Sequence, residues 1–262
     1  MNVTVRQPAV AGLFYPADAK PLHHLVRSLL EGSHSKEQVP KALIAPHAGY
    51  IYSGAIAASA YASLLPARQR IKRVILLGPA HHVGFPGLAV SSAAAFLTPL
   101  GEIPVDGEAV KKLLELPSVR ELDEAHAEEH SLEVQLPFLQ ETLESFSLVP
   151  VVVGSATPDE VRQVLDLLWG GEETLIVISS DLSHFHDYAT ARRLDESTTK
   201  SIEAMRPQDL DYDAACGRLP IAGLLLAARE HGLSVHTVDL RNSGDTAGSK
   251  DRVVGYGAYV LH

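Results

Sequence analysis

The sequence contains little sulfur and no long hydrophobic run. Its 262 residues include a single cysteine, Cys216, so an internal disulfide is impossible and the class of secreted disulfide scaffolds is excluded. Nowhere do about 18 apolar residues follow one another, so no membrane-spanning helix is expected. Residues 1–20 hold no apolar stretch of signal-peptide length. These absences predict a soluble, cytoplasmic protein.

Positive charge is also scarce. The chain has 22 Lys and Arg residues against 32 Asp and Glu residues, which gives a formal net charge of −10. A phosphate backbone and an anionic membrane surface would both repel such a chain, so the composition disfavours nucleic acid and membranes as partners. The hydrophobic content of 46% is ordinary for a soluble globular protein and suffices for a core without disulfides.

The order of apolar runs and helical stretches indicates the fold class. No internal repeat or low-complexity linker divides the chain, so residues 1–262 are expected to form one domain. Four short segments are apolar at nearly every position, which is typical of buried central strands: Lys41–Pro46, Arg73–Pro79, Leu148–Gly154 and Thr174–Ser179. Helical stretches alternate with them. This alternation predicts an α/β fold, a sandwich with a mixed, largely parallel central sheet flanked by helices.

Several segments have a helical pattern: Gly54–Leu65, Asp106–Leu116, Ser131–Ser145, the residues after Thr157, Tyr188–Met205 and Pro220–His231. Thr157 has the strongest start signal, because Pro158 follows it and Glu160 completes a capping box. Pro137 is expected to kink its helix or to mark the true start. Residues 97–105, 235–241 and 253–261 are expected to add antiparallel strands, which would make the sheet mixed.

Histidines follow three of the predicted central strands at the point where each strand ends. His47 follows the first strand, and His81 and His82 follow the second. Asp181 and His184 come after the strand that ends at Ser179. Because ligands bind outside the carboxyl ends of parallel strands in open α/β sheets, we expect these side chains to meet at a shared site.

Such a cluster indicates metal chemistry. Neutral imidazoles are the commonest metal ligands, and two or three of them near one point form a divalent-metal pocket. Two histidines and one anionic ligand would leave coordination positions open for substrate or water. The sequence offers two candidates for the anion: Asp181, three residues before His184, and the thiolate of Cys216.

A second histidine pattern points to a different chemistry. Residues 126–130 read HAEEH, which fits the H-x-x-E-H spacing of one class of zinc peptidases. In that class both histidines lie on one helix face. Ser131 resembles a helix cap, however, which would place His126 and His130 before the helix rather than on it. The spacing therefore does not favour a peptidase.

The same residues carry a family resemblance. The chain resembles the Memo family, whose bacterial and archaeal members are called AmmeMemoRadiSam system protein B. The matching stretches are IAPHAGYIYSG (44–54), LGPAHH (77–82), LTPLGEIPVD (97–106), EEHSLEVQLPF (128–138), PVVVG (150–154), SSDLSH (179–184) and CGRLPIAGLL (216–225). They span nearly the whole chain in family order. The family fold is in turn similar to that of class III extradiol dioxygenases, which are non-haem iron enzymes with an α/β sandwich.

The resemblance implies a role for each matched residue. His47 from PHAGY, His81 from GPAHH and Cys216 from CGR-P would be the metal ligands. Asp181 and His184, from SSD--H, would be catalytic residues beside the metal. By analogy with the dioxygenases, His184 would handle the substrate proton as an acid–base residue.

Three further residues are expected to bind substrate. The resemblance implies that His130, from the EHS--E motif, lines the pocket and hydrogen-bonds a ligand. His82 and Tyr50 stand beside the predicted ligands His81 and His47 and complete the expected set.

The departure from the dioxygenases affects the expected metal and reaction. A thiolate in place of their glutamate makes the site softer, so we expect iron(II) or copper, with zinc as a third option. The function expected is a metal-dependent, dioxygenase-like oxidoreductase acting on a small molecule or a peptide. The alternatives are a non-catalytic binding or adaptor protein with a vestigial pocket, and a metal-dependent hydrolase. The family name also implies a pathway link to a radical-SAM protein and an AMMECR-type protein.

Overall fold

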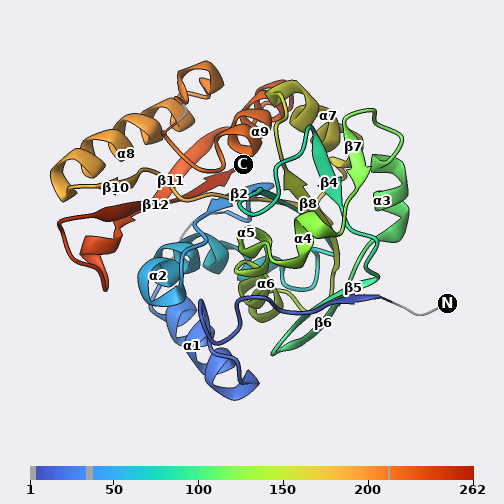
Figure 1. The fold of residues 1–262 in the computed structure, drawn as a ribbon, viewed down its shortest axis with the longest axis horizontal. Helices are drawn as coiled ribbons and strands as arrows, with labels where there is room; N and C mark the ends of the chain where they lie inside the picture. Colours follow the sequence, from blue (N-terminus) through green and yellow to red (C-terminus); the bar gives the residue numbers. More distant parts are fainter. Residues whose placement is uncertain (1–3, 34–37, 212) are drawn as a thin grey trace.

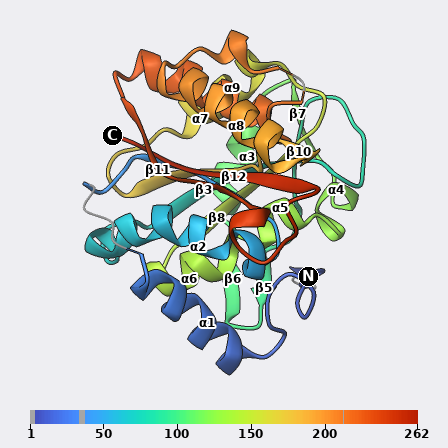
Figure 2. The ribbon, with the colours of Figure 1, turned by 90° about the vertical axis from the view of Figure 1, so that its left-hand side faces the viewer.

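A central sheet lies between two layers of helices. The structure is a computed structural model that describes residues 4–33, 38–211 and 213–262. Figure 1 shows the whole chain, and Figure 2 shows the sheet nearly edge-on between the two layers. One layer contains α1 (Ala19–Glu31), α2 (Tyr50–Tyr61), α5 (His130–Glu133) and α6 (Leu136–Thr142). The other contains α3 (Gly107–Leu113), α7 (Pro158–Leu168), α8 (Tyr188–Glu203) and α9 (Arg218–Glu230).

The centre of the sheet is parallel, and antiparallel pairings flank it on both sides. Its parallel core follows the order β2 (Ala42–Ala45), β9 (Thr174–Ser179), β3 (Arg73–Pro79) and β8 (Ser147–Val153). The outer strands are β10 (His184–His186), β11 (Val235–Asn242), β12 (Val253–Leu261), β4 (Leu88–Val90) and β7 (Val119–Glu121). β12 is antiparallel to β2, β10 and β11, and β4 is antiparallel to β8. The predicted α/β sandwich with a mixed sheet is confirmed.

The central strands are apolar on both faces because both faces are covered. In β3, Val74 and Leu76 join the core beneath α2 and α6, whereas Ile75 and Leu77 join the core beneath α7 and α9. All four side chains are fully buried. A strand packed on both sides has no solvated face to carry polar residues, which is why the sequence shows continuous apolar runs there.

One predicted strand joins a different sheet. Residues 97–105 were expected in the central sheet, but β5 (Ala95–Thr98) and β6 (Gly101–Pro104) form a hairpin that pairs with β1 (Val5–Arg6). That prediction is wrong for a simple reason. The antiparallel pattern is present, but alternation within a segment cannot indicate which distant strand completes its hydrogen bonds.

The helix signals are largely met, with shifted starts. The capping box is confirmed: the Thr157 hydroxyl accepts the Glu160 N–H at 3.2 Å, and the Glu160 carboxylate accepts the Thr157 N–H at 2.7 Å. Pro137 occupies the first turn of α6, so the expected 131–145 helix is divided into α5 and α6. α2 begins four residues before Gly54, so Gly54 lies inside the helix. A Cβ at this position would come within 2.9 Å of the Leu29 side chain of α1, so the glycine allows α1 and α2 to pack closely.

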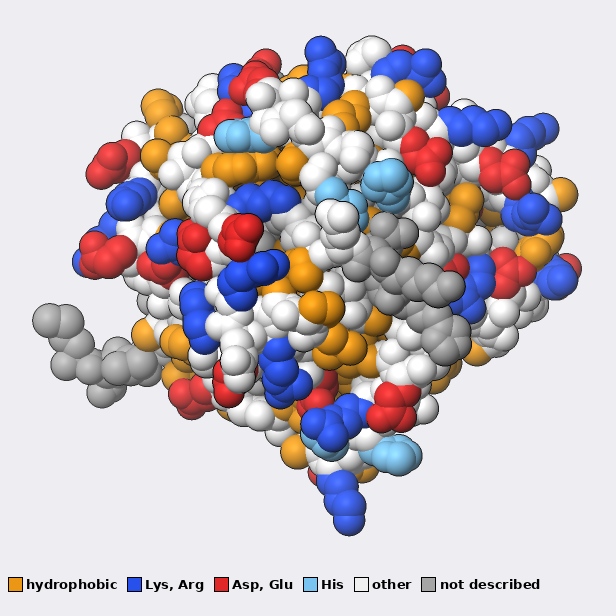
Figure 3. All heavy atoms as spheres, turned by 180° about the vertical axis from the view of Figure 1, so that it is seen from behind, with side chains coloured by type: hydrophobic (Ala, Val, Ile, Leu, Met, Phe, Trp, Pro, Cys, Tyr) orange, Lys and Arg blue, Asp and Glu red, His pale blue; other side chains and the backbone are white. Residues whose placement is uncertain are grey.

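Acidic and basic side chains are interspersed over the face shown in Figure 3. Short elements complete the description: α4 (Glu124–Ala127) and the 3₁₀ turns at Ala62–Ala67, Pro207–Asp209 and Ser243–Asp245. Within the described ranges, no helix has both the length and the apolar content needed to cross a bilayer.

Candidate metal centre

Neighbouring parallel strands bring the candidate ligands to one edge of the sheet. Ala45 at the end of β2 pairs with Ser179 at the end of β9. His47 comes two residues after Ala45, and Asp181 comes two residues after Ser179, so both lie at the same edge. β3 is the next strand, and His81 lies two residues beyond its end. The predicted convergence of the three strand ends is therefore confirmed by the register.

Two imidazoles and the only thiol lie close together at this edge. The ligand atoms of His47, His81 and Cys216 are all within 4.8 Å of one another, and His47 Nε2 lies 3.4 Å from Cys216 Sγ. One ion bonded to nitrogen at ~2.1 Å and to sulfur at ~2.3 Å would hold these two atoms about 3.6 Å apart in tetrahedral geometry. The donor set therefore fits a metal ion in chemistry and in spacing.

A hydrogen-bond network fixes the protonation of the His47 ring. The hydroxyl of Ser179 donates its one hydrogen to the carbonyl of Ser131 at 2.6 Å, because a carbonyl can only accept. Ser179 Oγ accepts from Gln135 Nε2 and lies 2.8 Å from His47 Nδ1. His47 must then carry its hydrogen on Nδ1, which leaves the lone pair of Nε2 directed toward Cys216.

Glu129 fixes the His81 ring in the same way. Its carboxylate accepts the His81 backbone N–H at 2.6 Å and lies 2.8 Å from His81 Nδ1. Burial alone would raise the pKa of Glu129, but hydrogen bonds from His81 and from the Ser131 N–H lower it to about 2. An ionised carboxylate can only accept, so His81 carries its hydrogen on Nδ1 and keeps a lone pair on Nε2. A second group of possible ligands consists of His81, Glu129 and His130, whose ligand atoms also lie within 4.8 Å of one another.

Burial controls the charge of the other two candidate ligands, His47 and Cys216. It lowers the pKa of His47 well below its usual value, and the neighbouring His81 and His130 lower it further, so the ring is neutral. Burial also raises the pKa of the Cys216 thiol to about 12, and the nearby Asp181 carboxyl acts in the same direction. Cys216 can therefore serve as a thiolate ligand only after losing a proton, as metal coordination requires.

Asp181 ties the ligand loops together. Its Oδ1 accepts the His47 backbone N–H at 2.8 Å, its own N–H points to Cys216 Sγ at 3.2 Å, and its carbonyl accepts the Cys216 N–H. Burial raises its pKa to about 7. Of the two anions that the sequence offered, the structure places Cys216 in the donor group with the two histidines, while the Asp181 carboxylate orients the His47 loop.

A backbone irregularity lies next to His184. The pairing of β10 with β12 shifts register between His184 and His186, and Phe185 between them has φ = 63°, in the left-handed region. A bulky residue rarely adopts that conformation, so the bulge is a costly local feature. Burial lowers the pKa of His184, a backbone hydrogen bond at Leu182 acts in the opposite direction, and the charge of His81 lowers the pKa further.

His130 and His82 continue the cluster toward the surface. The His130 ring stacks on His81 with a centroid distance of 4.5 Å, and it lies edge-on to His47 at 5.4 Å. Burial and then the charge of His81 lower its pKa to about 4, so it is neutral. His82 lies 6.0 Å from His130, centroid to centroid, and Phe14 of the N-terminal segment covers His130 at 5.0 Å.

Tyr50 does not lie where the sequence placed it. It is buried in the core against Phe138, at a centroid distance of 4.9 Å, and its hydroxyl donates to the Val134 carbonyl at 2.7 Å. The prediction that it lines the pocket is therefore wrong. The reason is that α2 begins at Tyr50, and the rotation of this first turn directs Tyr50 inward and exposes Ile51 and Tyr52.

The H-x-x-E-H spacing does not form a metal site. His126 lies in α4 and is buried, and its Nε2 lies 3.0 Å from the Ala89 carbonyl. His130 begins the separate helix α5, so the two histidines share no helix face. The expectation that Ser131 caps this helix is also wrong, since the Glu129 carboxylate accepts the Ser131 N–H at 2.9 Å and takes the cap position.

Sequence reasoning missed the two groups that orient the ligands, Glu129 and Ser179. Both side chains are buried, and each belongs to a stretch that carries a candidate ligand or pocket residue. Buried polar residues flanking a histidine are a usable signal only when burial is known, because an acidic or hydroxyl residue in a loop is ordinarily solvated.

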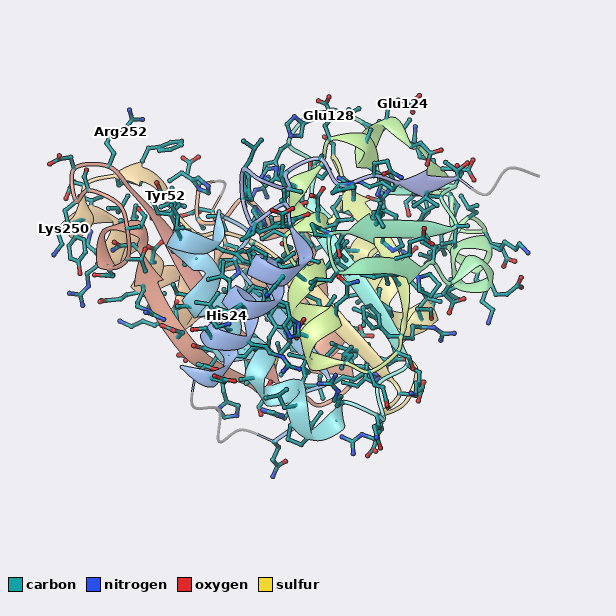
Figure 4. The ribbon with its side chains drawn as sticks, turned by 90° about the horizontal axis from the view of Figure 1, so that it is seen from below. His24, Tyr52, Glu124, Glu128, Lys250 and Arg252 are labelled. Atoms are coloured by element: carbon teal, nitrogen blue, oxygen red, sulfur yellow. The ribbon has the colours of Figure 1, made fainter. Side chains whose placement is uncertain are left out.

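Two cavities open beside the cluster. One of about 430 Å³ is lined by the loop after β3, the turn after β8 and the start of α9, and it includes His81 and Cys216. The other, of about 550 Å³, is lined by the N-terminal segment, His82 and His130. Figure 4 shows the side chains from below, with Arg252 and Lys250 labelled at the left of the view and Glu128 and Glu124 along its top.

The fold and the donor geometry together define an α/β protein with a candidate His/His/Cys metal centre at the carboxyl ends of its central strands. A search of the solved structures gives a likeness of fold. The chain matches the crystal structure of an uncharacterized protein from Escherichia coli K12, JW3007, with a TM-score of 0.55 and 14% identity over 82% of this chain and 98% of the other.

The family is shown by sequence. The family described as Memo-like protein matches residues 6–260. MEMO1 family proteins from Aquifex aeolicus and Methanosarcina mazei are 40% and 37% identical. These matches cover 96% of this chain and 97% of the first protein, and 98% of this chain and 99% of the second. The chain belongs to the Memo family.

Proposed function

We propose that this Memo-family chain is a metal-dependent oxidoreductase whose ion is bound by His47, His81 and Cys216. The observation that carries the proposal is the pair of Nδ1-protonated rings whose Nε2 lone pairs remain available beside a thiol, all within 4.8 Å. A bound iron or copper ion would supply redox chemistry, and the thiolate makes the site softer than one built on a carboxylate.

The surrounding residues support a reaction that moves a proton. His184 has a lowered pKa, so its ring is neutral near pH 7 and able to accept a proton from a substrate. His130 is neutral for the same reason and is placed to hydrogen-bond a substrate. Asp181 acts through backbone contacts that hold the His47 loop in place. His82 lines both cavities and completes the proposed substrate-binding set.

The first experiment measures metal binding. Protein purified without a histidine tag is titrated anaerobically with Co²⁺, iron(II) and copper(I), with Co²⁺ used because a thiolate ligand gives it a distinct charge-transfer absorption. We expect about one ion per chain, with binding lost in His47→Ala and His81→Ala and the charge-transfer band lost in Cys216→Ser. His126→Ala, at a histidine outside the cluster, is the matched control and keeps its ion. Equal binding in all these variants would remove the proposed site.

The second experiment measures turnover. Metal-loaded protein is incubated with candidate substrates while O₂ consumption is followed. We expect His184→Gln to lower the rate while retaining the ion, because this residue handles a proton and is not a ligand. Retained metal with no O₂ consumption, together with hydrolysis of ester or amide substrates, would move the assignment to a metal-dependent hydrolase.

A second candidate function is binding without catalysis. Large apolar side chains are exposed around the cluster: Leu13 precedes Phe14, Ile51 lies in the first turn of α2, and Phe185 follows His184. Their exposed fractions are 81%, 69% and 61%. Exposed apolar groups of this size favour a partner or peptide that covers them. A metal-loaded protein that forms a stable complex but converts no substrate would support this function.

A further inference from the structure

A buried arginine from the N-terminal segment contacts the part of the chain that carries Glu129. Arg6 lies in β1, which pairs in parallel with β5, and its guanidinium lies over the Phe96 ring at 5.7 Å. Only 7% of the residue is exposed. The guanidinium forms an ion pair with the buried carboxylate of Glu133. Lysine would supply the same charge, so the other contacts of the guanidinium distinguish this residue.

Two further nitrogens of the guanidinium bind backbone carbonyls. Arg6 Nε donates to the His126 carbonyl at 3.0 Å, and Nη2 donates to the Glu129 carbonyl at 2.8 Å. These carbonyls flank a break in the helical chain, because α4 ends at Ala127 and α5 begins at His130. The last carbonyls of a helix have no partner in a following turn, and a guanidinium offers its donors in a fixed planar arrangement. Arg6 therefore holds the break in one shape.

The break determines where the Glu129 carboxylate lies. Glu129 has an extended backbone, with ψ = 121°, and it is the residue that caps α5. From there its carboxylate accepts the Ser131 N–H at 2.9 Å and the His81 N–H at 2.6 Å, and it lies 2.8 Å from His81 Nδ1. A capping side chain reaches the first turn of a helix only from a non-helical backbone. The contact of Glu129 with His81 therefore depends on the break.

We propose that Arg6 is a positioning residue for the metal centre: by holding the His126 and Glu129 carbonyls, it keeps the Glu129 carboxylate against His81. Arg6 lines neither of the two cavities beside the cluster, so it acts through Glu129. That the contact serves a bound ion rests on the proposed function, in which His81 is a ligand. The contact itself is present without an ion.

The test separates the backbone contacts of Arg6 from its ion pair. Arg6→Lys keeps a charge beside Glu133 but lacks the planar fork, so one ammonium does not reach the carboxylate and both carbonyls together. Glu133→Gln is the matched control, because it removes the ion pair and leaves the carbonyl contacts of Arg6 in place. Both variants should be less stable in urea than the unmodified chain, so stability alone does not distinguish them.

The first readout is amide hydrogen exchange of the metal-free chain. It reports the His81 and Ser131 N–H groups that Glu129 binds. We expect Arg6→Lys to speed the exchange of these two amides about three- to tenfold relative to the amides of β9, because the hydrogen bonds that protect them weaken. Glu133→Gln should leave their exchange unchanged relative to β9.

The second readout is Co²⁺ affinity in an anaerobic titration. Arg6→Lys should lose about tenfold in affinity, the lower end of the loss expected for groups that orient a metal-bound histidine. Glu133→Gln should stay within about twofold of the unmodified chain, because Glu129 keeps its place.

Unchanged exchange of the two amides in folded Arg6→Lys overturns the proposal, and so does unchanged Co²⁺ affinity in a chain that binds the ion. Equal losses in Glu133→Gln overturn it too, because the effect would then follow the ion pair. If Arg6→Lys does not fold, the double variant Arg6→Gln/Glu133→Gln replaces it, since this variant leaves no unpaired buried charge. It is compared with Glu133→Gln in the same two measurements. If neither folds, Arg6 supports the whole fold and the local role is removed.

The two proposals fail separately. Faster exchange of the two amides in Arg6→Lys, in a chain that binds no Co²⁺, supports the hold of Arg6 on Glu129 and removes the metal function. A chain that binds Co²⁺ but shows no change of exchange in Arg6→Lys keeps the metal function and removes the positioning role.

Discussion

Replacing Glu129 by glutamine tests whether the network around the candidate centre prepares His81 for a metal. The Glu129 carboxylate makes bonds of 2.6 Å to the His81 N–H, 2.8 Å to His81 Nδ1 and 2.9 Å to the Ser131 N–H. Glutamine has nearly the same shape but carries no charge, and one end of its amide is a donor. A donor facing His81 Nδ1 allows the hydrogen to move to Nε2, which would remove the lone pair that a metal needs.

The expected magnitude follows from the role of this contact. Removing a group that orients a metal-bound histidine typically costs 10- to 100-fold in metal affinity, about 1.4–2.7 kcal/mol. Because His47 and Cys216 keep their positions, we expect weakened binding rather than its loss. His81→Ala, which removes a ligand outright, should be more severe.

The assay is a competition titration of Co²⁺ or Zn²⁺ against a chelator of known affinity. Glu141→Gln is the matched control, since Glu141 of α6 also lies 2.6 Å from a histidine Nδ1, that of His23 in α1, and neither residue belongs to the cluster. Unchanged affinity in a folded Glu129→Gln chain would refute the reasoning from the tautomer, and an equal loss in Glu141→Gln would show that the effect is not local.

Three other predictions concern stability. Burial raises the pKa of Asp195 to about 6, so the folded state keeps a proton that the unfolded state releases at about pH 4. The free energy of unfolding should therefore fall as pH rises between these values. Asp195→Asn should make that fall smaller in denaturant titrations, while buried Asp181 continues to contribute to it. Glu133→Ala should cost about 3–5 kcal/mol in urea unfolding, because it removes the carboxylate that forms an ion pair with buried Arg6. Gly232 and Gly107 both have room for a methyl group, but only Gly232 has a positive φ, of 71°. Calorimetric melting should therefore show a loss of about 1 kcal/mol for Gly232→Ala and a gain of ~0.5–1 kcal/mol for Gly107→Ala, since alanine is strained only at the first and favoured in the helix at the second. A gain at Gly232 would contradict the strain argument.

The elements that could be predicted from sequence share one property: their signal is local. The apolar run of β3 and the capping box at Thr157 each depend on residues within a few positions of one another, and both are present as predicted. The convergence of His47, His81 and Asp181 could also be predicted, because it needs only the assumption that the strands before them are parallel neighbours.

The two errors have different causes, a local helix start in one case and a distant strand contact in the other. Tyr50 packs inward because α2 begins there, and residues 97–105 join β1 because the N-terminal segment crosses beside them. The predicted pathway link to a radical-SAM protein and an AMMECR-type protein, and the expectation of a cytoplasmic location, stay predictions.

The sequence by itself determined the layered α/β architecture and brought His47 and His81 to one edge of the sheet, since buried strands and their ends are written in neighbouring positions. Cys216 entered as the third ligand only through the resemblance of its motif to the Memo family. Only the tertiary structure decided that both rings hold their hydrogen on Nδ1, because Ser179 and Glu129 reach them from other parts of the chain. The physical reason is the same in each case: the charge and protonation of a side chain depend on the groups that surround it in space, and those groups are brought together by folding.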